Sequence, residues 1–237
     1  MKNVRLTDLQ LSQLSKLAYE PNRKKIESQL AIWFPPTCPT PLKAIHHIYV
    51  KRTDTEGFAV VIGDQLIMVG TGTDSLKDML IDLCAWRIPF WLNGLKVSLH
   101  RGFVKVHEDL EEEVYKILYD PSISNLLNNQ EIKQITYTGH SLGSIVAQSL
   151  AIHTSKFGFL KKIPKRICVD GCPGGWSKSG AAEMSRLFPD FIRYKNTNDP
   201  VTWIPASSSW PGKARKLKGK WGHSVKKYIH NKRKLFG

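Results

Sequence analysis

The fold is decided by residues 132–155, IKQITYTGHSLGSIVAQSLAIHTS. The segment Ile132 to Thr138 is rich in β-branched and aromatic residues, which predicts a strand that runs into Gly139. From Leu142 to Ser155 the apolar residues gather on one side, which predicts a helix. Only Gly139-His140-Ser141-Leu142-Gly143 separates the two elements. The segment therefore predicts a strand that turns sharply into a helix, with Ser141 at the corner.

A G-x-S-x-G sequence between a strand and a helix is typical of a nucleophilic serine. Such a corner holds the serine in a strained conformation and exposes its hydroxyl above the sheet. The backbone N–H of Leu142, at the helix N-terminus, is positioned to stabilise a developing oxyanion. We interpret His140 as a packing residue. A glycine-framed turn at the edge of a sheet is the alternative for the whole pentapeptide.

Strands and helices alternate after this segment, at Arg166–Val169, Ala181–Leu187 and Phe191–Lys195. Before it, a helix is expected over Thr7–Tyr19 and another over Gly102–Tyr119, and strands are expected over 47–51, 58–62 and Leu66–Val69, with a further helix from about Ser75 to Leu83. Alternation of this kind favours a mainly parallel sheet. We therefore predict a single α/β domain over residues 1–237, with a central, mostly parallel sheet flanked by helices.

The composition places limits on the class of protein. Hydrophobic residues make up 41% of the 237 residues, so the chain is expected to fold around a core. No apolar run reaches the roughly 18 residues that a membrane-spanning helix needs. The first twenty residues contain no signal peptide, which suggests a cytoplasmic protein or one released by a non-classical route.

The four cysteines, Cys38, Cys84, Cys168 and Cys172, form no C-x-x-C pair. Their spacing gives no support to a zinc site or a redox motif, and we expect reduced, buried thiols. No metal or other cofactor is predicted.

The formal net charge is +15, and no acidic residue follows Asp199. A basic C-terminal segment, residues 212–237, carries most of the late lysines and arginines. One-signed segments of this kind suggest an anionic partner, such as a phospholipid surface, or else no more than a solvated tail. Nucleic acid would attract the same charge, but no nucleic-acid-binding motif is present. Nothing in the sequence indicates an oligomeric state.

Four blocks resemble the fungal-type, class three lipase family of the α/β-hydrolase superfamily, and they occur in the family's order. They are VGTGTDSLKDMLIDL (69–83), LHRGFVKVHEDLEEEV (99–114), ITYTGHSLGSIVAQSLA (135–151) and YKNTNDPVTWIPA (194–206). Together these blocks extend over most of residues 57–206. The resemblance implies an α/β-hydrolase fold and a Ser–Asp–His triad in that chain order.

The resemblance also implies the remaining site residues. Asp199 matches the family's aspartate, which would orient the histidine. Only His223 and His230 follow it, and Gly222-His223-Ser224-Val225-Lys226-Lys227-Tyr228 resembles the family's His-Ser-x-x-x-Tyr ending. His223 is therefore the expected base, and His230 is expected to be solvated. Thr73 is the expected second oxyanion donor, although it could serve only as a helix cap.

The segment near 84–98 lies where these lipases carry a lid. Its aromatic residues Trp86, Phe90 and Trp91 are expected to cover the acyl site, or alternatively to pack in the core under a loop. A lid together with a basic surface favours a lipase or phospholipase that acts on acylglycerol or phospholipid esters. A soluble short-chain esterase, or a non-catalytic member that binds lipid or a polyanion, are the alternatives.

Overall fold

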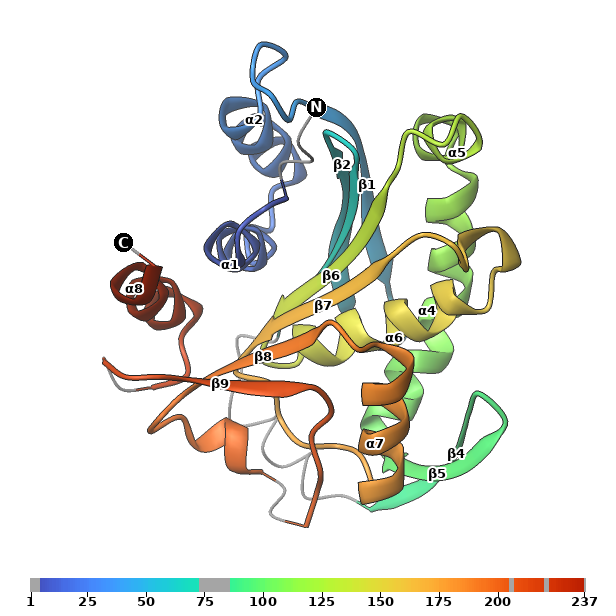
Figure 1. Ribbon diagram of the computed structural model, residues 1–237, viewed down its shortest axis with the longest axis vertical. Helices are drawn as coiled ribbons and strands as arrows, with labels where there is room; N and C mark the ends of the chain where they lie inside the picture. Colours follow the sequence, from blue (N-terminus) through green and yellow to red (C-terminus); the bar gives the residue numbers. More distant parts are fainter. Residues whose placement is uncertain (1–4, 73–85, 205–206, 220–221, 237) are drawn as a thin grey trace.

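The computed structural model describes residues 5–72, 86–204, 207–219 and 222–236. Its centre is a seven-stranded sheet in the order β1-β2-β3-β6-β7-β8-β9 (Figure 1). The strands are β1 (Leu42–Val50), β2 (Thr55–Ile62), β3 (Gln65–Gly70), β6 (Gln134–His140), β7 (Lys165–Asp170), β8 (Phe191–Asn196) and β9 (Lys213–Leu217). The first three pair antiparallel, and every pair from β3 to β9 is parallel. The predicted mostly parallel sheet is confirmed.

Helices cover both faces of this sheet (Figure 1). One face carries α1 (Asp8–Leu17), α2 (Arg23–Trp33) and α8 (Val225–Phe236). The other carries α4 (Arg101–Tyr119), α5 (Pro121–Asn128), α6 (Gly143–Ser155) and α7 (Lys178–Leu187). Short 3₁₀ helices, η1 (Gly158–Leu160) and η2 (Pro200–Trp203), lie in the connections. This is the layered arrangement expected of an α/β protein.

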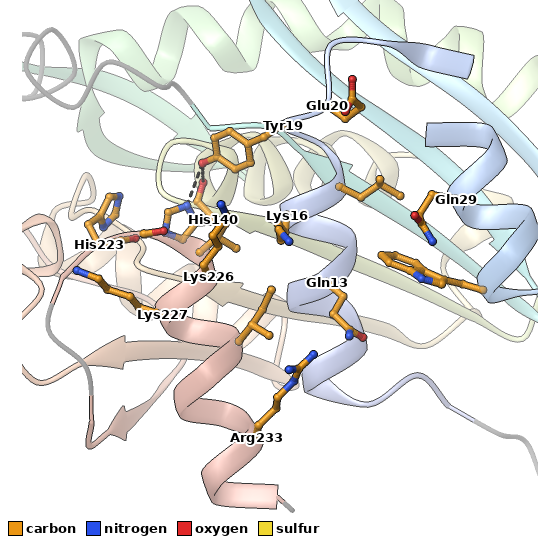
Figure 2. A pocket seen from close by; sticks show the side chains of 15 residues that line it. Gln13, Lys16, Tyr19, Glu20, Gln29, His140, His223, Lys226, Lys227 and Arg233 are labelled. Atoms are coloured by element: carbon orange, nitrogen blue, oxygen red, sulfur yellow. Dashed lines mark hydrogen bonds between the residues drawn. The ribbon is translucent and has the colours of Figure 1, made fainter. Parts of the chain in front are cut away.

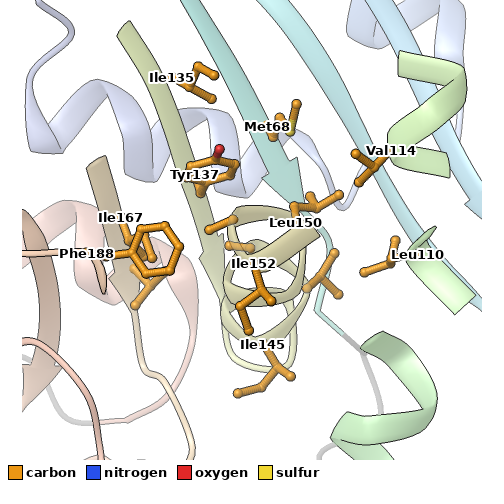
Figure 3. Packing of buried hydrophobic residues seen from close by; sticks show 14 of the residues in the cluster. Met68, Leu110, Val114, Ile135, Tyr137, Ile145, Leu150, Ile152, Ile167 and Phe188 are labelled. Carbon is orange, nitrogen blue, oxygen red and sulfur yellow. The ribbon is translucent and has the colours of Figure 1, made fainter. Parts of the chain in front are cut away.

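The strands supply both cores because successive side chains of a strand point to opposite faces. On β2, Ala59 and Val61 join the core under α4 and α6, whereas Phe58, Val60 and Ile62 join the core under α1 and α2. Helix α6 is buried along almost its whole length, and Figure 3 shows its side chains Ile145, Leu150 and Ile152 among the core residues. This burial fixes the helix that follows Ser141 rigidly against the sheet.

The described elements that the sequence predicted agree with the expectations apart from their ends. Helices α2, α5 and α8, strand β9 and the two strands between residues 87 and 100 are not among the expected elements. The expected helix from about Ser75 to Leu83 lies outside the described residues, as does Cys84. Cys168 and Cys172 are buried free thiols, and Cys38 is half-buried. Within the described part of the chain, no helix combines the length and hydrophobicity needed to span a bilayer.

The segment predicted as a lid is, over its described part, a β-hairpin of β4 (Arg87–Leu92) and β5 (Leu95–His100). One face of the hairpin is buried: the Phe90 ring meets His107 edge-on, with 4.9 Å between ring centroids. On the other face Trp91 is 66% exposed, and Trp86, directly before β4, is 85% exposed. Phe90 is thus a core residue, and only the two tryptophans have the exposure expected of a lid.

The basic C-terminal segment 212–237 is an integral part of the fold, which corrects its interpretation as a solvated tail. It forms the edge strand β9 and helix α8, which packs beside α1 (Figure 1). Lys232 is only 1% exposed, and its ammonium lies 2.7 Å from the Asp170 carboxylate and 2.6 Å from the Ser12 hydroxyl. A buried lysine needs such partners because an unpaired charge is costly to desolvate.

Candidate active site

Ser141 stands at the corner between β6 and α6 with a backbone φ of 59°, a conformation that side-chain-bearing residues rarely adopt. The flanking glycines make this corner possible. A Cβ on Gly139 would lie 2.2 Å from the Gly143 carbonyl oxygen, and one on Gly143 would lie 2.3 Å from the Gly70 carbonyl oxygen. The helix therefore starts in direct contact with the strand ends. This is the strained strand-to-helix turn that the G-x-S-x-G pattern predicts.

Backbone groups hold the corner in place. The Ser141 N–H donates to the Asp170 carbonyl at 3.0 Å, which ties the end of β6 to the end of β7. Leu142 caps the N-terminus of α6, where the first N–H groups have no partner within the helix. The Leu142 N–H is therefore suitably placed to bind an oxyanion. The second expected donor, Thr73, lies outside the described residues.

Asp199 and His223 form a buried pair, although 24 residues separate them. The Asp199 carboxylate oxygens lie 2.8 and 3.0 Å from His223 Nδ1, and Asp199 is completely buried. A carboxylate can only accept here, so Nδ1 carries a proton, and in the neutral ring Nε2 is the nitrogen with the lone pair. Among the described residues Nε2 has no hydrogen-bond partner. The imidazole is therefore held in the tautomer that can act as a base.

Gly171 links this pair to the corner of Ser141. It follows Asp170, whose carbonyl binds the Ser141 N–H, and it has a positive φ of 59°. A Cβ at this position would lie 3.0 Å from His223 Cε1 and 3.2 Å from Asp199 Oδ2. Glycine is required here because the histidine ring and the carboxylate pass directly over the backbone. Asp199 and His223 thus lie against the short turn after β7 to which the Ser141 backbone is also hydrogen-bonded.

Asp199 contacts His223 and not His230. His230 lies farther along α8 and is half-buried, so the expectation that it is solvated is wrong. The local pattern explains the position of Asp199, because this residue caps η2 and accepts from the Val201 N–H at 3.0 Å. The Asn-Asp-Pro turn and the contact to histidine therefore coexist. Of the two histidines that follow Asp199 in the sequence, His223 is the one that contacts its carboxylate.

Tyr228 is a member of the site to which sequence reasoning assigned no role. Its hydroxyl donates to Asp199 Oδ2 at 2.6 Å and accepts from the Asn196 N–H at 3.1 Å. Burial and the Asp199 charge raise the pKa of Tyr228 well above its ordinary value, so the hydroxyl stays a donor. The His-Ser-x-x-x-Tyr pattern could have indicated this role, because it places Tyr228 in the first turn of α8, five residues after His223.

His140 packs against His223 and does not take its place as the candidate base. Its Nε2–H donates to the His223 carbonyl, so Nδ1 accepts from the Tyr19 hydroxyl at 2.9 Å. Burial and the neighbouring His223 lower the pKa of His140 to about 3. Both ring nitrogens are occupied and the ring is neutral, which agrees with its interpretation as a packing residue. Within the described ranges, no cluster of three or more His, Cys, Asp or Glu residues could hold a metal ion.

Comparison with solved structures finds lipases of the same fold at low sequence identity. The chain is similar to lipase II from Rhizopus niveus, with 19% identity, a TM-score of 0.68, and coverage of 93% of this chain and 84% of that one. It is also similar to Lip2 lipase from Yarrowia lipolytica, with 18% identity, a TM-score of 0.66, and coverage of 90% and 78%. A third is a triacylglycerol lipase whose catalytic centre is described as a serine protease triad, with 16% identity, a TM-score of 0.66, and coverage of 89% and 79%.

No curated protein sequence matches the chain significantly. The family model for "Lipase (class 3)" does match, over residues 67–209. This range begins in β3, includes the Ser141 corner and Asp199, and accounts for more than half of the chain. The chain therefore belongs to the class 3 lipase family of serine hydrolases, with the α/β-hydrolase fold.

Proposed function

We propose that this protein hydrolyses carboxylic esters of lipids through an acyl-enzyme on Ser141, with His223 as the base and Asp199 as the residue that orients it. The observation that carries the proposal is the buried Asp199–His223 pair beside the strained Ser141 corner. The description of a similar triacylglycerol lipase as having a serine protease triad supports the same assignment. Acylglycerol or phospholipid esters are the proposed substrates.

The first half of the reaction forms the acyl-enzyme. Ser141 Oγ attacks the ester carbonyl carbon while His223 Nε2 accepts the hydroxyl proton. Negative charge develops on the carbonyl oxygen, and the Leu142 N–H stabilises it together with a second donor, for which Thr73 is our candidate. The bond to the leaving alcohol then breaks, and the alcohol takes the proton from His223. Asp199 stabilises the imidazolium that exists between these two transfers.

The second half returns the enzyme to its starting state. Water attacks the acyl carbon and gives its proton to His223, and the bond to Ser141 Oγ breaks as that proton passes to the serine. A carboxylic acid is released. Every proton that leaves one oxygen reaches another through Nε2, so the same tautomer is regenerated.

Covalent labelling with a phosphonate ester tests the proposal, because the reagent traps an activated serine. We expect a single phosphonyl mass shift on the peptide that contains Ser141, and none in Ser141→Ala. His223→Ala should abolish both labelling and ester turnover, whereas the matched variant His230→Ala should retain both. Turnover in Ser141→Ala at the wild-type rate would refute the mechanism.

A panel of esters with increasing acyl length separates the substrate classes. A lipase should prefer long acyl chains presented in micelles or vesicles over short soluble esters. A preference for short soluble esters alone would support a soluble esterase instead. Binding to lipid without hydrolysis or labelling would support the non-catalytic alternative.

A further inference from the structure

A basic groove runs between the N-terminal helices and the C-terminal helix, on the face of the sheet covered by α1, α2 and α8 (Figure 2). It encloses about 910 Å³. Helix α1 contributes Lys16 and Leu17, α2 contributes Trp33, and α8 contributes Lys226 and Ile229. The groove extends to His140 and His223. It thus reaches the segment that carries the proposed catalytic base.

The charges in the basic groove are not compensated. Its cations are Lys16, Lys226, Lys227 and Arg233, and within the described ranges none of them forms a salt bridge. The acidic residue that lines it, Glu20, lies 3.7 Å from Lys25 and accepts the Asn22 N–H. Clefts lined by one sign of charge concentrate ligands of the opposite sign. The groove is therefore suited to an anion.

The basic groove also has apolar walls, which select among anions. Leu17, Trp33, Val225 and Ile229 line it beside the cations. Trp33 is 38% exposed, and its neighbour Ile32 on the outer side of α2 is 71% exposed. A small hydrated anion would leave these side chains unused. An amphipathic anion would satisfy the cations with its headgroup and the apolar side chains with its hydrocarbon part.

Two lysines of the basic groove follow the proposed catalytic histidine closely in the sequence. Lys226 and Lys227 occupy the first turn of α8, which begins two residues after His223. The Lys227 ammonium lies over Gly222, 2.5 Å from the point that a Cβ there would occupy. A headgroup bound by these lysines would therefore contact the same short segment that positions His223.

We infer that the basic groove binds the phosphate headgroup of an anionic phospholipid, with Lys16, Lys226, Lys227 and Arg233 as the cations that attract it and Trp33 against the hydrocarbon. This inference deepens the proposed function and rests on it for the choice of lipid over other amphipathic anions. The site would hold the enzyme on an anionic surface through α1 and α8. Trp91, on the hairpin of β4 and β5, and Trp86, directly before it, do not line the groove.

Vesicle binding tests the inference, and the Ser141→Ala background removes hydrolysis from the measurement. Co-sedimentation compares mixed phosphatidylglycerol–phosphatidylcholine vesicles with pure phosphatidylcholine vesicles. In this background Lys16→Gln/Lys226→Gln should lower affinity for the anionic vesicles about 25-fold, since each basic residue near such a surface contributes about fivefold. The matched control, Lys161→Gln/Lys162→Gln, removes two exposed lysines near η1, and its affinity should stay close to that of the parent.

Further arms separate the possible occupants. Trp33→Gln should weaken vesicle binding and leave the binding of inorganic phosphate unchanged. Equal losses in the two lysine pairs would show a general charge effect and overturn the site. Binding of polyglutamate that depends on Lys16 and Lys226, with vesicle binding that does not, would replace the lipid by an acidic protein segment. Labelling of Ser141 is measured separately, so failure of the groove and failure of the hydrolase mechanism are distinguishable.

Discussion

Replacing Tyr228 by Phe removes one hydroxyl from the network that holds Asp199, and the consequences can be worked out from the structure. The Asp199 carboxylate loses its 2.6 Å donor and keeps the Val201 N–H and the His223 ring. The Asn196 N–H loses its acceptor. A hydrogen bond to a charged group contributes about 1.5–3 kcal/mol, and a buried unpaired donor costs about 1–3 kcal/mol.

We therefore expect Tyr228→Phe to lower the free energy of unfolding by about 2.5–6 kcal/mol, measured by urea denaturation. Turnover should fall by about 5–30-fold with little change in KM, because about 1–2 kcal/mol of Asp199 positioning is lost when the imidazolium forms. The assay is kcat and KM on a soluble ester, at a temperature at which both proteins remain folded.

A matched control exists at Tyr194, which is also buried and donates to a carboxylate, that of Asp8. Tyr194→Phe removes a similar hydrogen bond, but to a carboxylate that does not contact His223. This variant should lower stability without lowering kcat. Equal kcat values for Tyr228→Phe and the wild type would refute the role of Tyr228 in positioning Asp199. Equal losses of kcat in the two variants would show that the effect is only structural.

Three further perturbations test other parts of the structure. Gly171→Ala places a Cβ 3.0 Å from the His223 ring in a left-handed conformation, so kcat/KM should fall at least about tenfold, with a stability loss of about 1–2 kcal/mol in urea denaturation. Lys232→Met leaves the Asp170 carboxylate buried without its cation and should cost about 3–5 kcal/mol of unfolding free energy, part of which the added Asp170→Asn should restore. Burial lowers the pKa of His107 to about 2. Below about pH 6.5 the unfolded chain therefore binds a proton at this residue that the folded protein does not bind. The free energy of unfolding should then fall with decreasing pH by up to about 1.4 kcal/mol per pH unit. In His107→Leu, urea denaturation at pH 7 and pH 5 should show a smaller loss of unfolding free energy between the two pH values, by the contribution of one proton. An unchanged pH dependence would contradict this account.

The class of fold and the centre of the site could be predicted from the sequence because their signals are local. The strand, the G-x-S-x-G turn and the apolar side of the helix occupy 24 consecutive residues, 132–155. The glycines beside Ser141 are required by close backbone contacts: Gly139 lies against Gly143 at the start of α6, and Gly143 lies against Gly70 at the end of the neighbouring strand β3. Asp199 and His223 were chosen differently, because each lies in a short pattern that resembles the family's. Short-range spacing controls backbone conformation directly, so such features can be read along the chain.

Only the tertiary structure decided which charged side chains are buried and which residues they pair with. Lys232 looks like one more residue of a solvated basic segment, yet it is buried because Asp170 and Ser12 meet it from positions 62 and 220 residues earlier. Lys16 and Lys226 form one groove only because α1 and α8 lie side by side. Burial and pairing of a charge depend on which distant segments the fold brings together, and neither composition nor spacing records that.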